Sequence, residues 1–124
     1  MGNADYAKLR QELEQRTKTF ALGVIRLVES LPSGQATGIV GKQLLRSAAS
    51  VGANYRSAAR ARSKADFISK ISIAEEESDE TQYWLEILHE LSLIPESAYE
   101  SLHREAGELT AIFVTSGKTA KYGR

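Results

Sequence analysis

The sequence predicts an all-α protein, an antiparallel up-down-up-down four-helix bundle. Apolar residues recur at three- and four-residue steps through four long segments, the pattern of helices with one buried face. Short breaks containing proline or glycine separate these segments, and short connections make consecutive helices antiparallel neighbours. No stretch shows the strict alternation of a strand. We therefore expect one bundle domain over residues 1–124.

The first helix is predicted over about residues 5–31, where Pro32 and Gly34 interrupt the pattern. Its expected buried positions are Tyr6, Leu9, Leu13, Thr17, Phe20, Val24, Leu27 and Leu31. The second helix, about residues 37–62, has a face of mostly small residues. This face comprises Val40, Leu44, Ser47, Val51, Asn54, Ala58 and Ala61. Small side chains let a neighbouring backbone approach closely, so this helix should be central.

The third helix is predicted over about residues 64–91. Ser63 with Asp66 three residues later resembles a capping box at its start. Its buried face should comprise Phe67, Ile71, Ala74, Ser78, Thr81, Leu85 and Leu88. Pro95 suits the first position of a fourth helix, about residues 95–115, which should bury Tyr99, Leu102, Ala106, Leu109 and Phe113. Residues 117–124 should form a flexible basic tail.

Composition excludes several classes of protein. With 42% hydrophobic and 26% charged residues, the chain matches a globular domain rather than a disordered one. No apolar run approaches the roughly 20 residues of a membrane span, and no secretion signal opens the chain, so we expect a cytoplasmic protein without membrane contact. The absence of cysteine excludes disulfides and thiolate metal sites.

Charge is balanced overall but unevenly distributed. Residues 32–65 contain six Lys/Arg and no acid, whereas residues 66–93 contain eight acids and one Lys. Antiparallel pairing about a turn near residues 62–63 places Arg46 opposite Glu77 and Glu80. We predict a partly buried ion pair of Arg46 with one or both carboxylates, and Asn54 as a further polar member. This network should set the register of the second and third helices. The alternative is that these side chains are ordinary surface charges.

Two Glu-x-x-His motifs, Glu86 to His89 and Glu100 to His103, resemble ligand sets of di-metal bundles. The second helix offers no acid to complete such a site, and Glu86 and Glu100 should point away from the core. No nucleophile triad or complete phosphate-binding loop is present. We therefore assign no catalytic residue, metal or cofactor.

A basic patch near the predicted turn is the candidate nucleic-acid-binding surface. It comprises Arg56, Arg60, Arg62, Lys64 and Lys70. Such a patch either binds phosphates, with salt-sensitive affinity, or pairs with acids of the third helix or of another subunit.

Several apolar residues should face away from the core, which suggests a protein interface and homo-oligomerisation. These candidate interface residues are Leu22, Ile25, Leu45, Tyr83 and Ile87.

Three stretches carry a family resemblance: residues 43–55 (QLLRSAASVGANY), 65–67 (ADF) and 77–86 (ESDETQYWLE). They closely resemble the 23S ribosomal RNA intervening-sequence protein family. The resemblance implies a four-helix bundle assembled as a homopentamer. The chain also resembles the accessory protein of diversity-generating retroelements, which implies contact with nucleic acid and a reverse transcriptase.

The expected function is that of a non-enzymatic oligomeric scaffold that contacts RNA or DNA through the second helix. A protein-interaction adaptor without nucleic-acid affinity is the main alternative, and a metal-dependent enzyme is a remote one.

Overall fold

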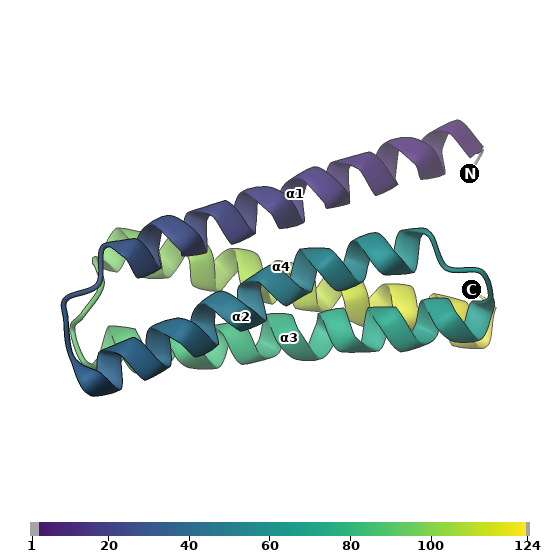
Figure 1. Cartoon of the computed structure of the whole chain (residues 1–124). Helices are drawn as coiled ribbons and strands as arrows, with labels where there is room; N and C mark the ends of the chain where they lie inside the picture. The colour runs from purple at the N-terminus through teal and green to yellow at the C-terminus, as the bar shows by residue number, and fades with distance from the viewer. Residues whose placement is uncertain (1–2, 124) are drawn as a thin grey trace.

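Four long α-helices joined by short turns make up most of residues 3–123, the part of the chain that this computed structural model describes. The helices are α1 (Asn3–Glu29), α2 (Gln35–Ala59), α3 (Lys64–Glu90) and α4 (Glu96–Tyr122). Consecutive helices run antiparallel, and α1 lies against both α2 and α4 (Figure 1). The predicted all-α up-down-up-down bundle is confirmed. Within the described residues, no helix has both the length and the apolar character needed to cross a membrane.

The core follows the predicted faces of the last three helices. On α3, every expected position except half-buried Phe67 is buried. On α4, Ala106, Leu109 and Phe113 are fully buried, whereas Tyr99 and Leu102, which were also expected to be buried, are half-buried against the core. Tyr55 of α2 is a buried residue that the small-residue pattern did not indicate. Its ring stacks on Phe113 with centroids 5.9 Å apart, and burial raises the pKa of its hydroxyl.

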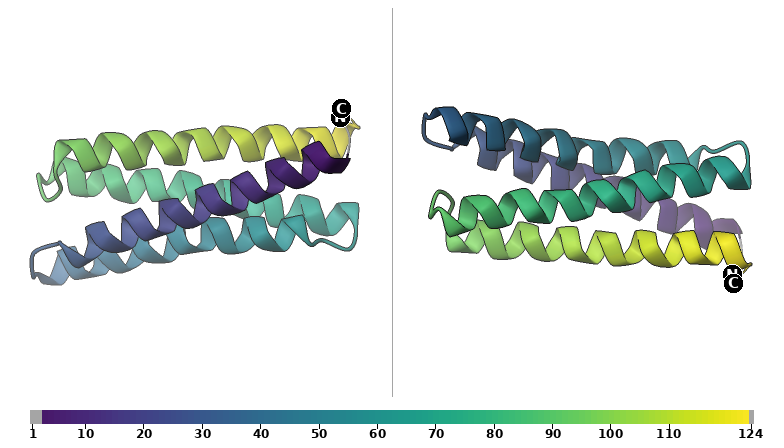
Figure 2. Two further views of the ribbon diagram at one scale, coloured as in Figure 1. Left: turned by 90° about the horizontal axis from the view of Figure 1, so that it is seen from above. Right: turned by 90° about the horizontal axis from the view of Figure 1, so that it is seen from below.

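The N-terminal half of α1 diverges from the bundle. Figure 2 shows α1 crossing the other helices obliquely, and Figure 1 shows its N-terminal end lifted away from them. The C-terminal half follows the prediction, with Phe20 and Val24 buried. The expectation that Tyr6 and Leu9 are buried is wrong, because the diverging end leaves them 61% and 46% exposed. Apolar periodicity identifies the inner face of a helix but does not determine how closely its ends approach the bundle.

The turns shift most helix ends by one to three residues from their predicted positions. After α1, the Ser30 and Leu31 amides donate to carbonyls three residues back, which tightens the chain before Pro32. Pro95 lies just before α4 rather than in its first turn. After α3, Ser92 has a left-handed conformation with φ of 57°, and its amide and the next donate to His89 and Leu88 carbonyls. These two bonds form a Schellman motif that ends α3.

The predicted flexible tail from residue 117 is wrong as far as residue 122, because α4 continues as helix to Tyr122. Gly117 lies against α3 within this continuation, where a Cβ would make an ordinary van der Waals contact with Ile71 at 3.6 Å. Gly123 then ends the helix in a left-handed conformation, with φ of 71°. Arg124 lies outside the described residues.

Candidate nucleic-acid interface

The turn between α2 and α3 positions the candidate site. The Ser63 hydroxyl accepts a hydrogen bond from the Asp66 amide at 3.0 Å, so the predicted cap at the start of α3 is present. At the end of α2, the Arg60 and Ala61 amides donate to carbonyls three residues back. The chain therefore reverses within residues 60–63, which determines which residues of α2 and α3 lie level with one another.

The predicted ion pair between α2 and α3 forms at the level expected from this turn. Arg46 Nη1 donates to both carboxylate oxygens of Glu77, at 3.2 and 2.9 Å, and Nη2 donates to Glu80. Trp84 Nε1 also donates to Glu80, at 2.9 Å. One turn of α3 thus presents two carboxylates to a single guanidinium, and Trp84 holds the second of them.

The network lies at the bundle surface, with its acidic side better buried than its basic side. The Glu77 side chain is 16% exposed and the Arg46 side chain 46% exposed. Desolvation opposes the charge on Arg46, but the hydrogen bond to Glu80 and the charge of Glu77 outweigh it and raise the pKa of the guanidinium. Arg46 therefore serves the contact between two helices, and its charge is already neutralised within the chain.

Asn54 is not a member of this network, contrary to the prediction. It lies two turns further along α2, and its side-chain amide donates to the Ser50 carbonyl at 2.9 Å. Two buried hydroxyls beside the network take the expected inter-helix role instead. Thr81 Oγ1 lies 3.0 Å from Ser47 Oγ and 2.8 Å from the Glu77 carbonyl. Both residues were predicted on the buried faces, but their mutual contact depends on how closely α2 and α3 pack.

The five candidate nucleic-acid-binding cations divide into one paired residue and four free ones. Arg60 Nη1 donates to Glu14 of α1 at 2.6 Å and to the Arg56 carbonyl at 3.2 Å. Among the described residues, no acid pairs with the other four. These free cations are Arg56, Arg62, Lys64 and Lys70; the first three are exposed and Lys70 is half-buried.

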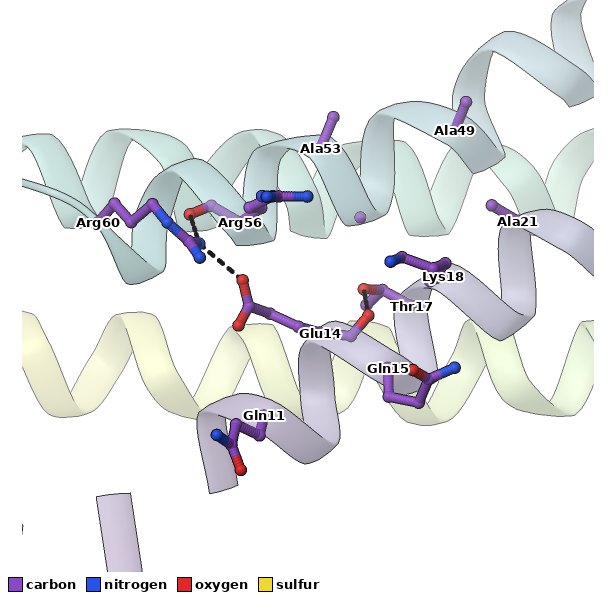
Figure 3. A pocket seen from close by; sticks show the side chains of 11 residues that line it. Gln11, Glu14, Gln15, Thr17, Lys18, Ala21, Ala49, Ala53, Arg56 and Arg60 are labelled. Carbon is purple, nitrogen blue, oxygen red and sulfur yellow. Dashed lines mark hydrogen bonds and ion pairs between the residues drawn. The ribbon is translucent and has the colours of Figure 1, made fainter. Parts of the chain in front are cut away.

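The pairing of Arg60 with α1 was not expected, because the prediction sought partners on α3 or on another subunit. Figure 3 shows Glu14 reaching from α1 toward Arg60 across a groove of about 610 Å³ between α1 and α2. The hydrogen bond from Arg60 lowers the pKa of the Glu14 carboxyl despite partial desolvation. Arg56 and Lys18 add cations to the groove, whose α2 side is built from Ala49, Gly52 and Ala53.

A second unforeseen ion pair joins α1 to α4. Arg16 donates to Glu105 through Nε at 2.7 Å and Nη2 at 2.8 Å, and to Glu108 through Nη2 at 2.6 Å. The bidentate contact with Glu105 raises the pKa of the Arg16 guanidinium. Arg16 also lines a shallow groove of about 510 Å³ between α1 and α4. Through Glu14 and Arg16, α1 is therefore ion-paired with α2 on one side and with α4 on the other.

Each of the two histidines lies within hydrogen-bond distance of a glutamate at the other end of the bundle. His89 Nε2 lies 2.8 Å from Glu96, and His103 Nε2 lies 2.8 Å from Glu86. Tyr99 stacks on His89, with ring centroids 3.8 Å apart, and lies beside His103. Each histidine contacts one carboxylate, and within the described residues no three His, Asp or Glu side chains are placed to hold a metal.

The candidate interface residues differ in exposure. Leu22, Ile25 and Tyr83 are exposed, whereas Leu45 and Ile87 are half-buried. Tyr83 packs edge-on against Trp84 with ring centroids 4.9 Å apart, so the exposed ring adjoins the Arg46 network. The exposed interface candidates therefore lie on two helices, α1 and α3, which do not contact each other within the described residues.

The model of the 23S rRNA-intervening sequence protein family matches residues 10–115, which include the Arg46 network and the free cations. The chain belongs to this family. A crystal structure from the S23 ribosomal protein family of Bacteroides thetaiotaomicron, described as a protein of unknown function, is similar to this family member. It shares 36% identity, covers 89% of this chain and 98% of its own, and superposes with a TM-score of 0.81. No curated protein matches significantly.

Proposed function

We propose that this family member is a non-enzymatic oligomeric scaffold that contacts RNA or DNA through the four free cations near the α2–α3 turn. The observation that supports this proposal is that some cations of α2 are paired with acids and others are not. Arg46 and Arg60 are neutralised by acids of α3 and α1, whereas Arg56 and its three neighbours are not, within the described chain. Positive charge that has no structural partner is available to phosphates.

RNA is the first ligand to test, because the family is named for an intervening sequence of 23S rRNA. The full chain is mixed with a labelled structured RNA at about 50 and 200 mM salt, and binding is followed by fluorescence anisotropy. We expect binding that weakens steeply with salt, because each phosphate contact releases a counterion.

A charge-matched pair of triple variants locates the contact. Arg56→Ala/Arg62→Ala/Lys64→Ala should lower affinity and flatten the salt dependence. The control, Arg26→Ala/Lys42→Ala/Arg104→Ala, removes the same charge from exposed residues without an ion-pair partner in the described chain. The control should bind like the unmodified protein. Absence of binding at low salt, or equal losses in both variants, contradicts the proposed contact.

A protein-interaction adaptor is the second candidate, favoured by the exposed apolar residues Leu22, Ile25 and Tyr83. This reading predicts no affinity for RNA at low salt. For either function we propose a homopentamer, as the family resemblance implies. Light scattering should then give a mass of five times 13.6 kDa, and a monomer would contradict the oligomer.

A further inference from the structure

Charge is segregated along the axis of the bundle. Residues 56–70 and 110–123 contain seven Lys/Arg and one acid, and the fold brings them to the end where α2 finishes, α3 begins and α4 finishes (Figure 1). At the opposite end, residues 86–100 around the α3–α4 turn contain four Glu and no Lys or Arg, and residues 26–42 around the α1–α2 turn add two cations and one acid. The 27 residues of α3 hold these ends about 40 Å apart. We refer to the first as the basic end.

The C-terminal turns of α4 contribute two cations to the basic end. Gly117 faces Ile71 of α3, so the antiparallel register places Lys118 and Lys121 beside the first turns of α3. Both lysines are exposed, and neither pairs with an acid in the described chain. They therefore lie on the same end as Lys64 and Lys70, although more than 40 residues separate the two pairs in sequence.

An exposed aromatic residue accompanies these cations. Tyr122, in the last turn of α4, is 73% exposed and directly follows Lys121. Tyr6 of α1 is also exposed. It lies near Tyr122 along the bundle axis, because Leu9 and Ser116, from the neighbouring turns of α1 and α4, line the same groove. An aromatic ring with a free face can stack on a nucleic-acid base. A duplex keeps its bases stacked inside, so such a ring favours an unpaired strand.

We propose that the basic end binds single-stranded nucleic acid, with Lys118 and Lys121 contacting phosphates and Tyr122 stacking on a base. This inference rests on the proposed function and adds α4 residues and a strand preference to it. The net negative charge of the opposite end disfavours phosphates, so the strand should bind at the basic end.

The test compares an oligouridylate of about 12 nucleotides with an RNA duplex of the same length, using the full chain at low salt. The single strand should bind more tightly. Tyr122→Ala should weaken single-strand binding by at least about fivefold, since stacking is lost. Tyr122→Phe should retain affinity, whereas Tyr122→Leu, which keeps apolar bulk without an aromatic face, should behave like the alanine variant.

Lys118→Ala/Lys121→Ala should lower single-strand affinity and reduce the logarithmic salt slope by about 1.4, two contacts at about 0.7 each. Its charge-matched control, Lys42→Ala/Arg104→Ala, should leave the slope unchanged. Circular dichroism and light scattering must show each variant helical and in the same assembly as the parent.

The outcomes separate the two proposals. Failure of the unmodified protein to bind either RNA overturns the proposed function and this inference together. Binding that requires Arg56, Arg62 and Lys64 but is unchanged by the Tyr122 and α4 lysine substitutions overturns this inference alone. Equal or tighter binding of the duplex likewise overturns the single-strand preference and leaves the proposed function standing.

Discussion

Arg46 on α2 donates two hydrogen bonds to the Glu77 carboxylate on α3, at 3.2 and 2.9 Å, across 31 residues of sequence. Glu77 is the more buried partner, and a second contact from the same guanidinium reaches Glu80. The arrangement requires one register of the α2–α3 hairpin, because a slip by one residue would rotate the carboxylates away from the arginine.

Arg46→Ala should lower the free energy of unfolding by about 1–2 kcal/mol. This is more than a fully exposed pair contributes and less than a fully buried one, because Glu77 is largely buried whereas Arg46 is exposed. Urea unfolding of Arg46→Ala, Glu77→Ala and the double variant gives the coupling energy of the pair. Arg26→Ala, an exposed control, should change stability by less than about 0.5 kcal/mol. A coupling energy of zero would show that the pair has no role in stability.

The Arg60–Glu14 pair should make the attachment of α1 sensitive to acid. Folding lowers the pKa of Glu14 from its ordinary 4.5, so the pair stabilises the fold above that pH and is lost as pH falls through the lowered value. Glu14→Gln should therefore cost about 0.2–1 kcal/mol near neutrality and progressively less as the pH falls below 4.5. Thermal unfolding across this range measures the difference. The control is Glu12→Gln, at an exposed residue without an ion pair in the described chain, and it should show no such pH dependence. If Glu14→Gln lowers stability equally at all pH values, the ion pair with Arg60 is not the cause of the loss.

Two glycines of α2 should respond in opposite directions to the same substitution. A Cβ at Gly38 meets nothing within 4 Å, so Gly38→Ala should stabilise the protein by about 0.4–1 kcal/mol through helix propensity. A Cβ at Gly52 would lie 3.2 Å from Oγ1 and 3.3 Å from Cβ of buried Thr17, so Thr17 would have to shift by a few tenths of an ångström within the packed core. Gly52→Ala should destabilise by about 1 kcal/mol or more. Equal effects in urea unfolding would show that α1 does not pack as closely on α2 as the structure has it.

The proposed oligomer should depend on the outward face of α1. Leu22→Asp/Ile25→Asp places charge on two exposed apolar residues and should reduce the mass measured by light scattering without loss of helicity. Leu91→Asp alters an equally apolar residue, 60% exposed at the end of α3, which the predicted interface does not include. It should leave the mass unchanged. An unaltered mass in the α1 variant would place the interface elsewhere.

The level of the Arg46 network was predictable because a hairpin with a short turn has few registers. Once Ser63 and Asp66 locate the start of α3, counting residues along antiparallel helices places Arg46 beside Glu77 and Glu80. The same logic failed for Asn54. Periodicity placed it on the inner face, but its side chain bonds to the Ser50 carbonyl of its own helix, as short polar side chains often do.

The sequence by itself determined the four helices, the buried faces of the last three and the register of the α2–α3 hairpin. These properties depend on residue spacing along one helix or across one short turn. Only the tertiary structure decided that α1 diverges, that Arg60 and Arg16 are neutralised by Glu14, Glu105 and Glu108, and that α4 extends to Tyr122 beside the free cations. These features depend on crossing angles and on contacts between residues distant in the chain, such as Gly117 on Ile71. Helical periodicity specifies which face of a helix turns inward but not the angle at which two faces meet.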